Sequence, residues 1–197
     1  ARWNPADGRI YAASRTTGAT AGVYVFDASG FPTQLVTVDD PACLAIAASG
    51  DIFYTLDFPG TIERLPFGST TPVSWVTGFH AGDDDPIGLA IAPPNANFSW
   101  LDPGDALVAD RGNGGPDEIW EWDAGVAEGE TAAHTDDGTL VNPVDVAISV
   151  ARVYVADDVN APGNGVIYAL ASDGTLAPIP GPGVDRPVGI PVDPSNP

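Results

Sequence analysis

The 197-residue sequence contains no lysine, no methionine and a single cysteine, and its only cations are seven arginines. Without lysine, the chain cannot form the lysine-dependent phosphate loop of Walker-type nucleotide-binding proteins. Its 27 acidic residues give a formal net charge of −20. This charge excludes nucleic-acid binding, because affinity for phosphate backbones depends on clustered cations. Cys43 alone can form neither an internal disulfide nor a cysteine-based zinc site.

Long apolar runs are also missing. No run approaches the roughly 18 residues that a membrane span needs, so we expect no membrane insertion. The sequence starts without methionine and without a basic leader, and we expect a processed chain or a piece of a longer protein. Neither a zinc-protease motif nor a nucleophile elbow occurs. The hydrophobic fraction of 44% is ordinary for a folded globular protein.

The sequence contains an internal repeat. A phrase of proline followed by alternating small and apolar residues recurs at residues 41–47, 86–92, 143–149 and 187–193. When an insertion between the second and third phrases is discounted, the period is about 40 to 50 residues, which is typical of a four-stranded propeller blade. We therefore treat residues 1–197 as one domain, with repeats that begin near residues 41, 86, 143 and 187.

Each phrase is followed by further short runs of β-branched and aromatic residues, bounded by glycine, proline, asparagine and aspartate. Such runs predict short antiparallel strands. No segment combines an apolar spacing of 3.6 residues with helix caps. The expected second strands lie at 9–13, 51–55, 106–110 and 152–157, and the expected third strands at 22–27, 61–65, 118–123 and 166–170. Trp120 and Trp122 alternate on one expected strand, and we expect both to pack between blades.

The phrases at 86–91 and 143–148, with the runs at 107–110 and 153–157, resemble NHL-like and gluconolactonase-like propellers. The resemblance covers essentially the whole chain and implies an all-β propeller of four-stranded antiparallel blades. About four blades and one spare inner strand are expected here. Two arrangements stay open: part of a larger, six-bladed propeller, or a four-bladed ring that the spare strand closes.

The acidic residues are expected to gather on one face. In a four-stranded blade, the loop between the second and third strands and the loop into the next blade lie on the same side. This rule places 13 of the 22 aspartates on one face, accompanied only by Arg15, Arg111 and Arg186. These aspartates are Asp39, Asp40, Asp57, Asp83, Asp84, Asp85, Asp110, Asp117, Asp136, Asp137, Asp157, Asp158 and Asp185. Solvation of turns, divalent-cation binding and adaptation to high salt are the three competing explanations.

Two equivalent loops are the best candidates for calcium binding. Each places an aspartate three residues before an asparagine, in a loop with nearby glycine: Asp110 with Asn113, and Asp157 with Asn160. Ca²⁺ prefers oxygen ligands from such side chains and from backbone carbonyls. The pattern differs from the twelve-residue EF-hand loop. Calcium is therefore an expected cofactor, without a defined coordination geometry.

Asp145 replaces a small residue in the repeated phrase, where its counterparts are Cys43, Gly88 and Gly189. The gluconolactonase resemblance implies a metal and catalytic carboxylates at the mouth of the central channel. It would make Asp145 a catalytic and metal-binding carboxylate, with Asp110 and Asp157 as neighbours. The glutamate that those families place on an early inner strand is not found in this sequence. Capping of loop N–H groups is the competing interpretation of Asp145. His80, in a loop on the acidic face, is a further candidate general base, and a solvent-exposed surface histidine is its alternative.

Two functional hypotheses follow. The first is an extracellular or periplasmic binding or scaffold module with calcium in its acidic loops, whose ligand is a protein or a carbohydrate and which further propeller blades outside this chain complete. The second is a metal-dependent, lactonase-like hydrolase with its site at the channel mouth. A quinoprotein-like sugar oxidase is disfavoured, because no dense pocket of cationic residues is visible in the sequence.

Overall fold

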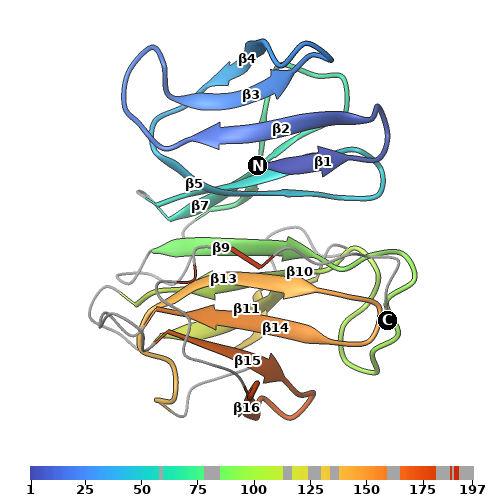
Figure 1. Ribbon diagram of the computed structural model, residues 1–197, viewed down its shortest axis with the longest axis vertical. Coiled ribbons are helices and arrows are strands. Elements are labelled where there is room, and N and C mark those ends of the chain that lie inside the picture. The colour runs from blue at the N-terminus through green and yellow to red at the C-terminus, as the bar shows by residue number, and fades with distance from the viewer. Residues whose placement is uncertain are drawn as a thin grey trace.

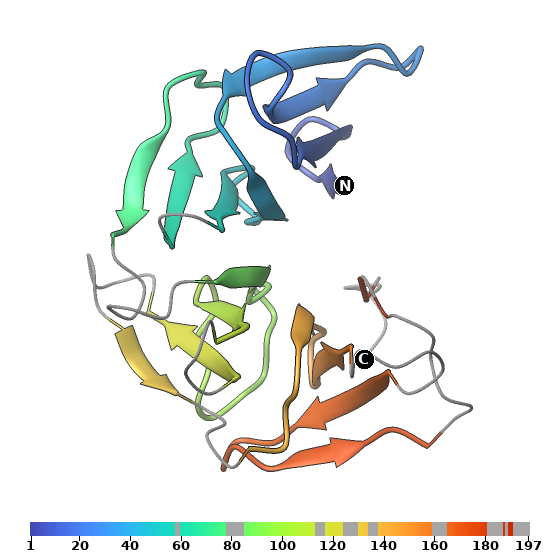
Figure 2. The same ribbon diagram turned by 90° about the vertical axis from the view of Figure 1, so that its left-hand side faces the viewer.

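The computed structural model describes residues 1–57, 60–77, 85–112, 117–123, 130–133, 138–158, 165–180, 187 and 189–190. In this part of the chain all regular structure is β-sheet, arranged as four sheets of four antiparallel strands each. Each sheet is built from four consecutive strands, so each is one propeller blade. The predicted all-β propeller is confirmed. Figure 2 shows the blades following one another along an arc, with their first strands toward its centre.

Blade 1 contains β1 (Arg2–Asn4), β2 (Arg9–Ser14), β3 (Gly22–Phe26) and β4 (Pro32–Thr37). Blade 2 contains β5 (Pro41–Ile46), β6 (Ile52–Leu56), β7 (Thr61–Leu65) and β8 (Val73–Val76). Blade 3 contains β9 (Pro86–Ile91), β10 (Ala106–Asp110), β11 (Glu118–Trp122) and β12 (Glu130–Ala133). Blade 4 contains β13 (Pro143–Ile148), β14 (Val153–Asp157), β15 (Val166–Leu170) and β16 (Leu176–Pro178) (Figure 1).

The inner strands begin where the repeated phrases predict, at Pro41, Pro86 and Pro143. They are apolar on both sides because successive blades pack against each other, so that β9 lies between β5 and β13. Leu44, Leu89 and Val146 belong to three separate clusters of buried side chains, one at each junction between successive blades. Burial of these clusters joins the four sheets into one structure.

Close packing of the inner strands explains a glycine in the second phrase. A Cβ atom at Gly88 would lie 2.7 Å from the Cα atom of Asp145 and 2.9 Å from the Cβ atom of Ala109. Real side chains do not tolerate such contacts, so β9 approaches β13 this closely only because residue 88 has no side chain. The same contact fixes the backbone of Asp145.

Trp120 and Trp122 lie on β11 and belong to the cluster between blades 2 and 3. Both indole rings are buried, with exposed fractions of 7% and 3%. The predicted packing of these two residues between blades is confirmed.

The two ends of the repeat differ. The chain opens with β1, an inner strand paired with β2, as the alignment of residues 3–8 with the repeated phrase indicates. At the fourth phrase, Pro187, Gly189 and Ile190 are described and none lies in a strand. Residues 191–197 lie outside the described residues, so ring closure by a spare strand stays a prediction. No helix in the described residues has the length and hydrophobicity to cross a membrane.

Candidate functional site

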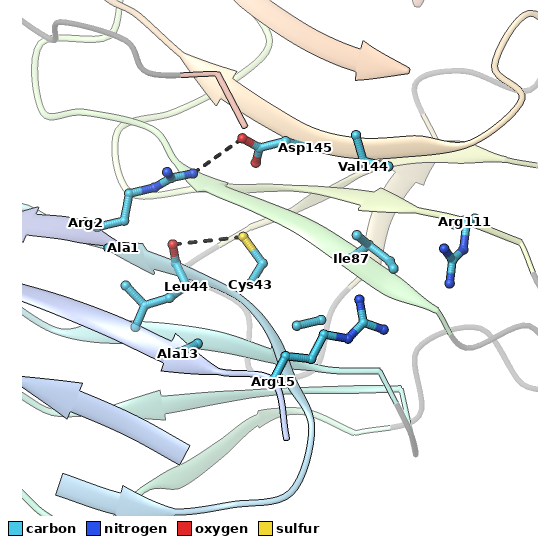
Figure 3. Close-up of a pocket in the computed structure, with 11 residues that line it drawn as sticks. Ala1, Arg2, Ala13, Arg15, Cys43, Leu44, Ile87, Arg111, Val144 and Asp145 are labelled. Carbon is cyan, nitrogen blue, oxygen red and sulfur yellow. Dashed lines mark hydrogen bonds and ion pairs between the residues drawn. The ribbon is translucent and has the colours of Figure 1, made fainter. Parts of the chain in front are cut away.

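A polar cavity of about 290 Å³ opens where the inner strands begin. Its lining comes from all four blades and includes Arg2, Arg15, Cys43, Ile87, Arg111 and Asp145 (Figure 3). The inner strands start on the side that carries the loops predicted to be acidic, because every connection into β5, β9 and β13 lies there. We call this space the mouth cavity.

A second cavity, of about 360 Å³, continues along the same inner strands. It is lined mainly by aliphatic side chains, including Leu89, Ile91, Val146 and Ile148, and it shares Arg2 with the mouth cavity. The centre of the arc is therefore polar at its mouth and apolar further along. Groups that can bind or react with a ligand lie at the mouth.

Asp145 on β13 is the only carboxylate among the described residues that line the mouth cavity. Only 2% of Asp145 is exposed, and its Oδ2 accepts a 2.8 Å hydrogen bond from the Ile190 backbone N–H. A guanidinium nitrogen of Arg2 lies 3.5 Å from the same oxygen (Figure 3). The other oxygen, Oδ1, is buried and has no hydrogen-bond partner in the described part of the chain.

Burial raises the pKa of Asp145 above its usual range, and the Ile190 N–H group and Arg2 oppose this shift only in part. A buried carboxyl group with an unpartnered oxygen can accept a hydrogen bond from a ligand or exchange a proton with it. Asp145 therefore lies at the predicted position, near the start of the inner strands. Its catalytic role stays a prediction.

Cys43 lies on β5 beside Asp145. Burial raises the pKa of the Cys43 thiol to about 11, and the nearby Asp145 carboxylate adds to the shift. Its Sγ atom lies 4.0 Å from the backbone carbonyl oxygens of Leu44 and Leu89. A thiol that stays protonated is a poor nucleophile, and Cys43 serves as a small packing residue.

Two arginines approach the mouth cavity from loops that follow second strands. Arg15 follows β2, and its guanidinium group bonds to Asp40 with Nε at 3.2 Å and to Asp57 with Nη2. Arg111 follows β10 and bonds to Asp85 Oδ2 with Nε at 2.9 Å and Nη2 at 2.6 Å. The sequence places both arginines on the acidic face, but not their convergence with Arg2 on one cavity. Arg15 and Arg111 each directly follow a second strand, and this shared position in the repeat could have predicted that these two arginines lie close together.

Of the predicted calcium residues, Asp145 lines the mouth cavity, whereas Asp110 and Asp157 do not. Asp110 and Asp157 end β10 and β14, and both are buried, with exposed fractions of 2% and 0%. Asp157 Oδ1 accepts a 2.7 Å hydrogen bond from the Asn142 N–H group, and Asp110 Oδ1 accepts one of 3.3 Å from the Asp85 N–H group. Asn113, Asn160 and His80 lie outside the described residues.

Within the described ranges, no three His, Cys, Asp or Glu side chains are close enough together to hold a metal ion. At Asp145 the donor set is a single carboxylate, and the Arg2 cation beside it opposes a second cation. The described residues of the mouth cavity therefore do not fit the metal that a gluconolactonase-like site implies. Calcium in the loops after β10 and β14 stays a prediction.

No protein-family model and no curated protein sequence matches the chain. Solved structures do match. A gluconolactonase from Xanthomonas campestris is 15% identical with a TM-score of 0.62, and the match covers 88% of this chain and 58% of that one. Nidogen, in its complex with laminin, is 16% identical with a TM-score of 0.63 over 82% of this chain and 57% of that one. TolB from Acinetobacter baumannii is 14% identical with a TM-score of 0.60 over 89% and 41%.

This chain thus spans about half the length of the solved proteins that it matches. At these identities the likeness concerns the fold. The four sheets, their order and the central mouth cavity give the chain the β-propeller architecture that these proteins share.

Proposed function

We propose that this chain is a propeller binding module whose ligand enters the mouth cavity and contacts Asp145. The observation that carries the proposal is the buried Asp145 carboxyl group, which has one oxygen without a partner among the described residues and lines a cavity of about 290 Å³. Retaining a buried, incompletely bonded carboxyl group costs folding free energy, so a ligand contact is a reason to keep it. Ligand pockets of closed β-folds such as barrels commonly lie at such mouths.

The ligand class in this proposal is a protein segment or a carbohydrate derivative. Similar propellers support both, because they include nidogen in complex with laminin, YCF48 bound to a D1 peptide, and gluconolactonases. The proposal also places the module in the extracellular or periplasmic space, with calcium in the loops that follow Asp110 and Asp157. Fractionation of cells that produce the protein tests the location.

Further propeller blades are part of this proposal. Ile10 of blade 1 and Ile52 of blade 2 hold equivalent positions in the repeat. Ile10 directly precedes Tyr11, as Ile52 directly precedes Phe53. Ile52 is 3% exposed because blade 1 covers it, whereas Ile10 is 50% exposed and its strand partner Trp3 is 61% exposed. An additional blade packed on this face of blade 1 would bury both side chains as Ile52 is buried.

Blocking the mouth tests the binding function. Ala42 lines the mouth cavity, and Ala42→Trp would fill it. Thr70→Trp is the matched control, because Thr70 lines a different cavity, together with Pro66 and Phe67. Thermal-shift and NMR screening with monosaccharides, aldonates and tripeptides should find compounds whose binding Ala42→Trp abolishes and Thr70→Trp preserves. Compounds that bind only outside the blocked cavity would contradict the proposal.

A second candidate function is hydrolysis of lactones, which the position of Asp145 and the likeness to gluconolactonases favour. Because the described residues do not fit a metal at Asp145, this candidate requires additional ligands from outside them. A panel of lactones tests it directly. Hydrolysis by the wild type that Asp145→Asn abolishes without lowering Tm would support the hydrolase. No hydrolysis by the wild type would exclude it and leave the binding module.

A further inference from the structure

Three of the seven arginines of a strongly acidic chain line one cavity. Arg2 comes from β1, Arg15 from the loop after β2 and Arg111 from the loop after β10, so they are far apart in sequence and meet only at the mouth. Their side chains are 35%, 45% and 38% exposed, respectively, so part of each side chain is accessible. In Figure 3 the three side chains surround the cavity, with Arg2 beside Asp145 and the other two near Ile87.

Aspartates hold Arg15 and Arg111 through one edge of each guanidinium group. The Nε and Nη2 atoms of Arg111 both bond to Asp85 Oδ2, and the same two atoms of Arg15 bond to Asp40 and Asp57. The Nη1 group of each arginine has no hydrogen-bond partner among the described residues. The carboxylates thus fix the orientation of both guanidinium groups and leave N–H donors available to the cavity.

An oriented guanidinium group with available donors suits a planar oxoanion. Arginine forms two parallel charge-assisted hydrogen bonds with a carboxylate, and these are stronger than neutral hydrogen bonds. Because ion pairs already hold the side chains of Arg15 and Arg111, less conformational entropy is lost when a ligand binds. The volume of about 290 Å³ limits the ligand to a small molecule or to the end of a chain.

We propose that the mouth cavity binds a small organic carboxylate, whose carboxylate group accepts hydrogen bonds from Arg15 and Arg111 and whose remaining polar groups face Asp145 and Arg2. This inference rests on the proposed binding function and specifies its ligand class. A polyhydroxy acid fits the arrangement, because hydroxyl groups can donate to the unpartnered Oδ1 of Asp145. The apolar contact comes from Ile87 and Leu44.

The test uses gluconate and sorbitol, which share a six-carbon polyhydroxy chain and differ in the carboxylate. Calorimetric titration should detect gluconate binding to the wild type and no comparable binding of sorbitol. Arg15→Gln and Arg111→Gln should each weaken gluconate binding by about tenfold or more, because each removes charge-assisted hydrogen bonds. Arg64→Gln is the matched control: Arg64 also pairs with an aspartate, Asp51, and is also 45% exposed, but it lies outside the mouth cavity.

A further variant and further anions complete the titration experiment. Arg111→Lys retains a cation beside Asp85 but loses the planar donor edge, so it should weaken gluconate binding even if Arg111→Gln does not fold. Inorganic phosphate, succinate and citrate complete the panel. The proposal fails if no carboxylate binds, if phosphate binds in their place, or if Arg64→Gln weakens binding as much as Arg111→Gln does.

The outcomes also separate this inference from the proposed function. If sorbitol binds as well as gluconate and Ala42→Trp abolishes both, the mouth cavity is a ligand site but does not select carboxylates. If gluconate binds and Ala42→Trp has no effect, the ligand lies elsewhere and both proposals are wrong. Loss of gluconate binding in Ala42→Trp, Arg15→Gln and Arg111→Gln alone supports both.

Discussion

Asp110 and Asp157 end the second strands of consecutive blades, and each carboxylate accepts hydrogen bonds from the loop that leads into the inner strand of its own blade. For Asp110 the donor is the N–H group of Asp85, immediately before β9. For Asp157 the donors are the N–H groups of Val141 and Asn142, immediately before β13. These carboxylates therefore tie the loops at the mouth to the second strands, whatever ions the loops bind.

Removing the Asp157 carboxylate should destabilise the fold. Asp157→Ala leaves two N–H groups without their acceptor, and an unsatisfied buried polar group costs about 1–3 kcal/mol. We expect the free energy of unfolding to fall by roughly 3 kcal/mol in urea denaturation. Asp173→Ala is the control, because Asp173 is an exposed turn residue that also accepts a backbone hydrogen bond, from Thr175. Equal effects of the two substitutions would show that Asp157 does not stabilise the mouth.

The close approach of β9 and β13 makes a second prediction. Gly88→Ala would place a methyl group 2.7 Å from the Asp145 Cα atom, and such overpacking costs about 1–3 kcal/mol. Gly189→Ala is the control, because a Cβ atom there would lie 3.6 Å from Asp145 Oδ2, an ordinary contact. Thermal denaturation should show a lower Tm for Gly88→Ala alone. A normal Tm for Gly88→Ala would mean that β13 can move away from β9.

The repeat made most of this fold predictable. The phrases at Pro41, Pro86 and Pro143 mark the inner strands because strands covered on both sides need a nearly continuous apolar pattern. The runs around Trp120 and Val153 mark a third and a second strand, because β-branched and aromatic residues favour strands. The position of Asp145 was also readable, since a carboxylate stands where other repeats have a small residue.

The contacts at the mouth cavity could not be predicted from the repeat. Arg2, Arg15 and Arg111 are isolated in the sequence, and only the curvature of the arc brings them to one cavity. The pairing of Arg15 with Asp40 and Asp57, and of Arg111 with Asp85, depends on loop conformations, for which many neighbouring aspartates compete. The hydrogen bonds of Asp110 and Asp157 depend on loops of different length and composition, which no periodicity describes.

Calcium is the third prediction. Aspartates gathered on one face repel one another over distances comparable with the Debye length, which lowers stability at low salt. A divalent ion bound near Asp110, Asn113, Asp157 and Asn160 would reduce this repulsion, and it would raise Tm with concentration because it binds the native state. We expect chelation to lower Tm at low ionic strength, and Ca²⁺ to restore it better than Mg²⁺, which demands tighter octahedral geometry.

Sodium chloride is the control for the calcium prediction. Simple screening by a monovalent salt acts on every surface charge and needs high concentrations, whereas a specific site responds to micromolar Ca²⁺. If sodium chloride restores Tm as fully as Ca²⁺ does, or if chelation changes nothing, the acidic face is a solvated or salt-adapted surface. The four loop residues would then lose their assignment as ligands.

The charge of Asp145 should cost stability at neutral pH. Burial raises its pKa above the usual 3.8, so between 3.8 and the raised value the folded chain binds more protons at this site than the unfolded chain does. The stability that Asp145 contributes is therefore fully present below pH 3.8 and is lost as pH rises through the folded pKa. Asn at position 145 carries no charge and can still accept the Ile190 hydrogen bond.

We therefore expect Asp145→Asn to be at least as stable as the wild type at pH 7, with an advantage that shrinks as pH falls toward 3.8. Urea denaturation of both proteins across this range measures the difference. A residue whose removal stabilises the fold is retained for another reason, and functional sites show this trade-off. The same variant should lose ligand binding at the mouth cavity. If Asp145→Asn instead unfolds more easily at pH 7 and binds normally, Asp145 is a structural residue that holds Ile190 and Arg2 in place.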